Sequence, residues 1–215
     1  MSADTMPAAD QGFAALRRFT RTRTPLLERC ELCSAALAQE HPHLVEPASR
    51  NILCACDPCA MLFDGPARGK YRRVSRSVRL LAAFRMTDAQ WESLLIPINM
   101  AFFFQSSVSG GMTVLYPSPA GAVESLLSLE AWEEVVQDNP VLNHLQPDIE
   151  ALLANRIGNR AEYYIAPIDR CYGLVGQIRL NWKGLSGGAE VWDGITRFFD
   201  ALRSQAEIIT GEAHA

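Results

Sequence analysis

The sequence has no long uninterrupted hydrophobic run. Its longest apolar stretch, from Leu94 to Phe104, is interrupted by Pro97 and Asn99 and is shorter than the roughly 20 residues that a membrane-spanning helix needs. The first residues also lack the basic start, the apolar segment and the small-residue cleavage site of a secretory signal. We therefore expect no membrane span and a cytoplasmic location.

An excess of basic residues is missing as well. Lysine and arginine total 20 against 24 aspartate and glutamate residues, which gives a formal net charge of -4 and a pI near 5.6. The electric field of such a chain does not attract polyanions, and the sequence carries neither a basic stripe nor a recognisable recognition helix. We expect no nucleic-acid partner, and this argues against a transcription regulator.

Several catalytic signatures are absent from the sequence. It contains no dinucleotide-binding G-x-G-x-x-G, no phosphate-binding G-x-x-x-x-G-K-[ST] and no zinc-protease H-E-x-x-H. His144 stands alone in its stretch, and Asp169 suits the positive end of a helix. We expect a protein that is not an enzyme. If it were one, the conspicuous region from Tyr163 to Tyr172 would be the place for a pocket.

Cysteine, by contrast, is concentrated in one place. The segment from Cys30 to Cys59 holds five of the six cysteines and two of the four histidines. In a reducing compartment such a cluster is more often a metal or redox site than a set of disulfides. Cys30 and Cys33 form one C-x-x-C pair and Cys56 and Cys59 form another, which together supply the four thiolates that tetrahedral zinc or iron prefers. The spacing predicts a metal site made by these four cysteines.

The ligand set has open alternatives. Cys54 precedes Cys56 by two residues, so both sulfurs would lie on the same side of an extended segment. His43 falls between the two pairs. A mixed set, such as Cys30, Cys33, His43 and one later cysteine, is therefore an alternative to the four-cysteine set.

Two other residues of metal-binding type are given simpler roles. His41 is expected to be a surface histidine, and Cys171 is expected to be a small core residue.

The chemistry of the predicted site depends on its ion. Zinc, the expected cofactor, has no redox chemistry and with four protein ligands would serve folding. Iron, the alternative, could carry one electron in a rubredoxin-like centre. Pro58 lies within the second pair while Ser34 and Ala60 follow the two pairs, so the prolines and glycines typical of rubredoxin knuckles are only partly echoed.

The pattern of turns and apolar runs predicts an α+β protein with a mainly antiparallel sheet, preceded by a small cysteine-ligated knuckle or ribbon module. We predict a flexible N-terminal arm at 1–25, a metal-binding module at 26–70, an α+β domain at 71–208 and a tail at 209–215. The elements expected in the domain are strands at 78–84, 98–106, 112–116 and 162–166, and helices at 88–95, 129–137, 168–182 and 189–208. The segment YPSPAGAVE, at 116–124, is expected to be a loop.

A combination of motifs adds a family resemblance. The motifs are CELC, EHPHL, CACDPCAMLF, IPINMAFFF, YPSPAGAVESLLSLEAW, NPVL, PDIEALL and APIDRCYGLVGQIRLNWKG. Together they resemble an uncharacterised bacterial family found in gene clusters of high-affinity, oxygen-tolerant nickel-iron uptake hydrogenases, over about residues 28–203.

This resemblance implies an accessory role and no catalytic residues. We expect a metal-binding accessory protein that supports maturation, assembly or electron transfer of the hydrogenase. It would act through contacts with a hydrogenase subunit or a maturation protein. A rubredoxin-like one-electron carrier is the alternative, and the oligomeric state is left open.

Overall fold

The structure is a computed structural model in which residues 28–65, 69–126, 128–158, 161–184 and 186–210 are described. The arm expected at 1–25 and residues 211–215 of the expected tail lie outside this part. No helix among the described residues combines the length and apolar character needed to cross a bilayer.

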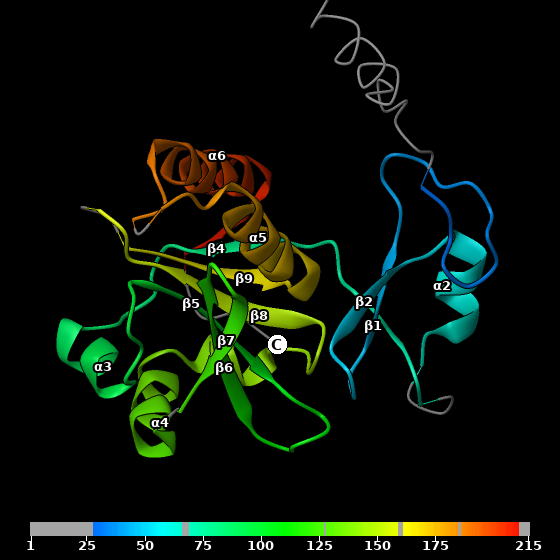
Figure 1. Ribbon diagram of the computed structural model, residues 1–215. Coiled ribbons are helices and arrows are strands. Elements are labelled where there is room, and N and C mark those ends of the chain that lie inside the picture. The colour runs from blue at the N-terminus through cyan, green and yellow to red at the C-terminus, as the bar shows by residue number, and fades with distance from the viewer. Residues whose placement is uncertain (1–27, 66–68, 127, 159–160, 185, 211–215) are drawn as a thin grey trace, which may run out of the picture.

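A three-stranded antiparallel sheet forms the N-terminal part of the fold (Figure 1). It has the order β2-β1-β3, with β1 at His43–Glu46, β2 at Asn51–Cys54 and β3 at Arg72–Arg73. Helix α2, at Asp57–Phe63, lies beside it. A small core of its own holds this part together, made by Cys30, Leu37, Leu44, Ala55, Cys59 and Ala60.

A seven-stranded sheet forms the larger part, in the order β10-β4-β9-β8-β5-β6-β7. Its strands are β4 (Arg79–Leu81), β5 (Met100–Gln105), β6 (Met112–Ser118), β7 (Gly121–Ser125), β8 (Glu150–Asn155), β9 (Glu162–Pro167) and β10 (Glu207–Ile209). Every neighbouring pair is antiparallel except β10 with β4. The predicted α+β class with a mainly antiparallel sheet is confirmed.

Helices cover both faces of the larger sheet. Helices α5 (Ile168–Asn181) and α6 (Ala189–Gln205) cover one face, while α3 (Asp88–Ser93), α4 (Leu129–Asp138) and the short 3-10 helix η1 (Pro140–His144) lie on the other (Figure 1). Successive strand residues point to opposite faces, so Phe102 and Phe104 join the core under α5 and α6, and Phe103 joins the other core. The central strands are therefore apolar on both sides.

Three strands of the larger sheet, β7, β8 and β10, were not expected from the sequence. β8 is short and buried on both faces, so its apolar residues show neither a helical nor a strand period. β7 lies in the segment expected to be a loop. Its partner β6 tolerates Pro117 because β5 pairs with β6 only as far as Leu115, which leaves that end of β6 paired on one side. The last helix ends at Gln205 instead of Ile208, because Ile208 pairs with Leu80 in the parallel strand β10.

Strand β1 connects the two sheets. Leu44 points into the small core, whereas Val45 joins the core between the larger sheet and helices α5 and α6. Close by, the Arg72 guanidinium donates a hydrogen bond to the carbonyl oxygen of Pro147 at 2.7 Å. One face of β1 therefore belongs to the cysteine-containing part, and the other face contacts the larger domain.

Candidate metal centre

The first cysteine pair lies in a tight turn. The backbone N–H of Ser34 donates to the carbonyl oxygen of Cys30 at 2.7 Å, and the N–H of Cys30 donates to the carbonyl oxygen of Ala35 at 2.8 Å. Ser34 has φ of 63°, in the left-handed region that usually favours glycine. Serine therefore adopts the glycine-like conformation that closes the turn and brings the sulfurs of Cys30 and Cys33 to the same side.

The second pair begins a helix. Cys56 is the N-cap of α2 and Cys59 lies in its first turn, with Pro58 among the first helical residues. Proline suits this position because it needs no hydrogen-bond partner for the missing N–H. The two cysteines are three residues apart on the helix, so their side chains lie on one face, next to the positive end of the helix dipole.

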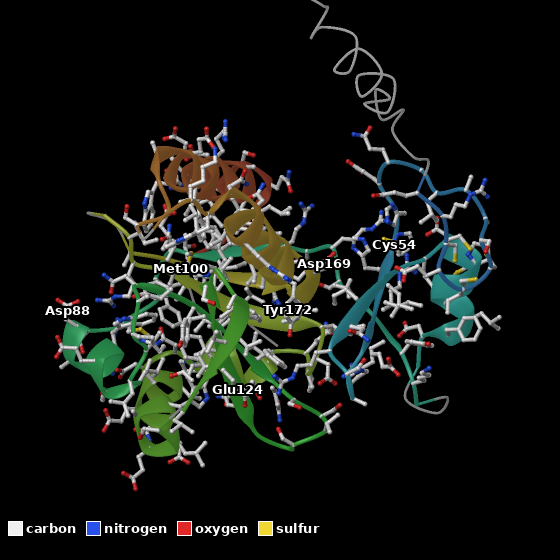
Figure 2. The ribbon with its side chains drawn as sticks, viewed as in Figure 1. Cys54, Asp88, Met100, Glu124, Asp169 and Tyr172 are labelled. Atoms are coloured by element: carbon white, nitrogen blue, oxygen red, sulfur yellow. The ribbon has the colours of Figure 1, made fainter. Side chains whose placement is uncertain are left out.

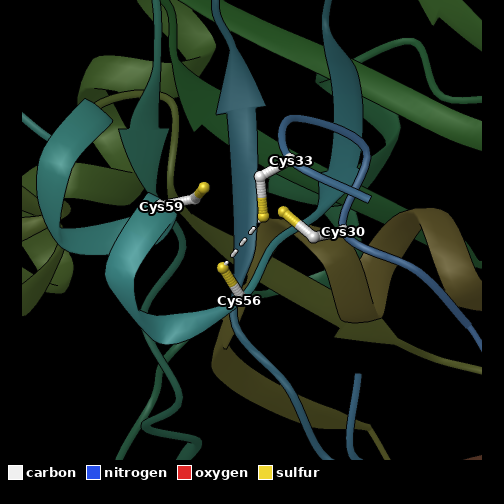
Figure 3. A group of neighbouring side chains, drawn as sticks. All are labelled: Cys30, Cys33, Cys56 and Cys59. Atoms are coloured by element: carbon white, nitrogen blue, oxygen red, sulfur yellow. Dashed lines mark hydrogen bonds between the residues drawn. The ribbon is translucent and has the colours of Figure 1, made fainter. Parts of the chain in front are cut away.

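The two pairs converge on one point (Figure 3). The four Sγ atoms of Cys30, Cys33, Cys56 and Cys59 lie within 4.8 Å of one another, and those of Cys33 and Cys56 are 3.6 Å apart. A tetrahedral ion with metal–sulfur bonds of about 2.3 Å requires sulfur–sulfur distances of about 3.8 Å. All six cysteines are among the described residues, and none of them forms a disulfide. The four cysteines therefore lie close enough together to hold a metal ion.

The backbone around the cluster favours a thiolate at one position. Burial opposes ionisation of Cys30, but backbone N–H groups of Cys56, Cys33 and Leu32 donate to its sulfur and lower its pKa to about 6. Burial and hydrogen bonds with the neighbouring sulfurs raise the pKa of Cys59 to about 12. A bound cation would lower the pKa of Cys59 again, because a metal-bound thiol loses its proton.

The structure places His43 and Cys54, the alternative ligands, in a separate group with His41. One ring nitrogen of each histidine and the Sγ of Cys54 lie within 4.8 Å of one another. Cys54 and Cys56, which the sequence placed side by side, fall into different groups: β2 ends at Cys54, and Cys56 caps helix α2 within the four-cysteine group. The expectation of a surface histidine at 41 is wrong, because its side chain is only 7% exposed.

Asp169 is the residue near this second group that no local pattern revealed. It lies in the first turn of α5, as expected, and its Oδ2 is 2.6 Å from Nδ1 of His43. Figure 2 shows Asp169 on the side of α5 that faces the sheet carrying Cys54. Asp169 and His43 are 126 positions apart, so only the tertiary fold brings them together. The sequence did contain an indication for His41. It precedes His43, the first residue of β1, by two positions, so in an extended segment both side chains project to the same side.

Other candidate residues have structural roles. The hydroxyl of Tyr163 accepts a hydrogen bond from Arg156 at 2.9 Å, and that of Tyr164 donates to Glu162 at 3.1 Å, so both hydroxyls have partly buried polar partners. Cys171 is fully buried, and burial raises the pKa of its thiol. His144 is exposed in η1.

One catalytic pattern needs its structural context. The run from Gly184 to Gly188 matches the letters of G-x-S-x-G, the serine-hydrolase motif, with Ser186 at the nucleophile position. That motif requires a turn from a strand into a helix. Here the run joins two helices, α5 and α6, so it does not form a nucleophile elbow.

A comparison with protein families matches residues 29–206, which is more than half of the chain, to a family of unknown function, DUF5947. The chain belongs to this family. The resemblance to an uncharacterised family is confirmed at that level. Searches of the curated proteins and of the solved structures each found no match.

Proposed function

We propose that this DUF5947 protein is a metal-binding accessory protein that holds zinc at Cys30, Cys33, Cys56 and Cys59. The observation that carries the proposal is the convergence of four thiols from two separate segments within 4.8 Å. Four protein ligands leave a tetrahedral ion no open position, which suits a structural zinc ion. The ion would join the turn before β1 to helix α2 and so stabilise a part of the chain with few core residues.

The partner in this proposal is a subunit or maturation protein of a nickel-iron uptake hydrogenase. The support is the motif resemblance together with an apolar surface beside the metal centre. Met61 and Leu62 follow Cys59 in α2, and they are 67% and 57% exposed. Large apolar side chains exposed side by side are typical of protein–protein contact sites.

One observation favours the iron alternative. Cys33 is exposed, so a metal bound there would lie near the surface, where another redox centre can approach. The second pair favours zinc, because it opens a helix and does not form a second turn like that around Ser34. A rubredoxin-like carrier is thus the second candidate.

The first test is elemental analysis with a visible spectrum. Protein purified anaerobically without a metal-binding tag should contain at least one zinc per chain and should be colourless, because zinc has a filled d shell. Iron with thiolate charge-transfer bands would overturn the zinc proposal and establish the electron carrier. Absence of both metals from protein expressed with each of them would contradict a metal-binding function.

A second prediction concerns the partner surface. Met61→Ser combined with Leu62→Ser should weaken binding to purified hydrogenase subunits or maturation proteins by at least about tenfold, because two buried apolar contacts would be lost. The matched control is Leu180→Ser, which changes a leucine that is 86% exposed on α5. Biolayer interferometry with each purified partner measures the affinity. Equal binding by the double variant and the control would exclude the α2 surface, and no binding by the wild type would contradict the hydrogenase role.

A further inference from the structure

His41, His43 and Cys54 are brought together by the hairpin of β1 and β2. His43 and Cys54 are directly paired in its antiparallel register, so their side chains project from the same face. His41 precedes His43 by two residues, and their rings meet edge to face with centroids 4.9 Å apart. Three side chains of metal-binding type thus converge outside the four-cysteine centre.

Hydrogen bonds fix which nitrogen of each histidine is available. Nδ1 of His41 lies 3.0 Å from the carbonyl oxygen of Ala38, and Nδ1 of His43 lies 2.6 Å from Oδ2 of Asp169. A carbonyl and a carboxylate oxygen only accept, so each Nδ1 carries the hydrogen. In the neutral ring the lone pair is then on Nε2, which is the atom free to bind a cation.

His41 provides an independent indication of a ligand. Its side chain is more than nine-tenths buried, with 7% exposed, and its Nε2 has no hydrogen-bond partner within the described residues. A buried polar atom without a partner destabilises the fold, so native proteins rarely leave one. A metal ion bound at Nε2 would remove this destabilisation.

Asp169 holds the ring of His43 as a carboxylate holds a zinc-binding histidine. Its Oδ2 accepts from His43, and its Oδ1 accepts from the backbone N–H of Arg170 at 2.7 Å. With both oxygens engaged, Asp169 orients the histidine and is not itself a ligand. Three protein ligands remain, which leaves a fourth position of a tetrahedral ion open.

The open position has space beside it. His41 and His43 line a cavity of about 1060 Å³, which Arg76 and Arg170 also line. Glu40 and Asp169 line the same cavity, so its charges are mixed, and it has room for a water molecule or a small anion as the fourth ligand. Zinc sites with an exchangeable ligand have three protein ligands and one open position, whereas structural sites have four protein ligands. The second group resembles the first kind and the four-cysteine centre the second.

We propose that His41, His43 and Cys54 form a second metal site, which binds a divalent cation of the zinc class separately from the four-cysteine centre. Two imidazoles and one thiolate match zinc and exclude calcium and magnesium, which take oxygen ligands.

The test compares zinc content and ligand type in full-length, untagged protein. The wild type should contain two zinc ions per chain, and zinc X-ray absorption should show both sulfur and nitrogen ligands. His41→Ala, His43→Ala and Cys54→Ser should each contain one zinc, and the two histidine variants should show sulfur ligands only. His144→Ala, an exposed histidine elsewhere, is the matched control and should keep two.

Three results would overturn the second site. These are one zinc per chain in the wild type, two in the His43→Ala variant, or the loss of all zinc in a histidine variant. The last would mean that the histidines belong to a single shared centre.

Asp169→Ala tests the positioning role. Loss of such a carboxylate typically lowers metal affinity about 10–100-fold, so we expect this decrease at the second site and none at the four-cysteine centre. Asp169→Asn retains an acceptor oxygen and should lose less. Asp193→Ala, at an exposed aspartate on α6 that does not line the cavity, is the control. Chelator competition measures both affinities, and an Asp169→Ala affinity equal to the control would remove Asp169 from the site.

Discussion

Replacing Cys30 with serine should lower the zinc content by one ion per chain and unfold the residues around the four-cysteine centre. Cys30 is 1% exposed and is one of the six described residues that form the small core. Binding of structural zinc contributes about 10–16 kcal/mol in small zinc modules at pH 7, and a serine hydroxyl does not replace the thiolate. The double variant Cys30→Ser with Cys56→Ser, which breaks both pairs, should show the full effect.

Tryptophan fluorescence separates this effect from general unfolding. All four tryptophans lie after residue 90, in the larger part of the fold, so their denaturation transition does not report on the cysteine-containing part. We expect that transition to remain cooperative in Cys30→Ser, while hydrogen exchange in β1 and β2 becomes fast. The midpoint of the tryptophan transition should shift to a slightly lower denaturant concentration, because Val45 of β1 contacts the larger core.

Cys171→Ala is the matched cysteine control and should give the opposite pattern. Cys171 is 0% exposed in the larger core, so its replacement should lower the tryptophan transition and leave zinc unchanged. Unchanged zinc content in Cys30→Ser would remove Cys30 from the ligand set. Loss of the tryptophan transition in the same variant would show that the two parts do not fold separately.

Short-range chemistry explains what the sequence could predict. The C-x-x-C pairs bring their own sulfurs together through local turns, so the four cysteines could be grouped without a fold. Helix α3 was predicted from Thr87, whose side chain accepts from the N–H of Gln90 while Gln90 accepts from the N–H of Thr87. Strands β5 and β6 were predicted as a hairpin around the glycines of the SVSGG turn, and β9 was predicted from its aromatic and branched residues.

Long-range pairing explains what the sequence could not predict. β8 is buried between β5 and β9, and its Leu152 and Leu153 point to opposite cores, so no period marks it as a strand. The second group depends on the β1–β2 register, which puts Cys54 opposite His43 and away from Cys56. Its link to Asp169 depends on how α5 packs against that hairpin.

Phe103→Ala should cause the largest loss of stability in the larger domain. The Phe103 ring is 0% exposed in the central strand β5, where it stacks on Trp132 with centroids 5.0 Å apart and meets Trp91 edge to face at 6.4 Å. Removing a fully buried phenylalanine typically costs about 3–5 kcal/mol, because the cavity that remains loses contacts on every side. The total stability of a domain is about 5–15 kcal/mol, so this loss is a large fraction of it.

Denaturant titration followed by tryptophan fluorescence measures this loss directly, since two of the reporting tryptophans contact Phe103. The control, Val108→Ala in the β5–β6 turn, removes a side chain that is 64% exposed and should change stability by less than about 0.5 kcal/mol. At denaturant concentrations above the tryptophan transition of Phe103→Ala, zinc should stay bound at the four cysteines. The cysteines and the small core around them lie outside the larger sheet. Release of that zinc together with the tryptophan transition would show that the metal centre depends on the larger domain for its fold.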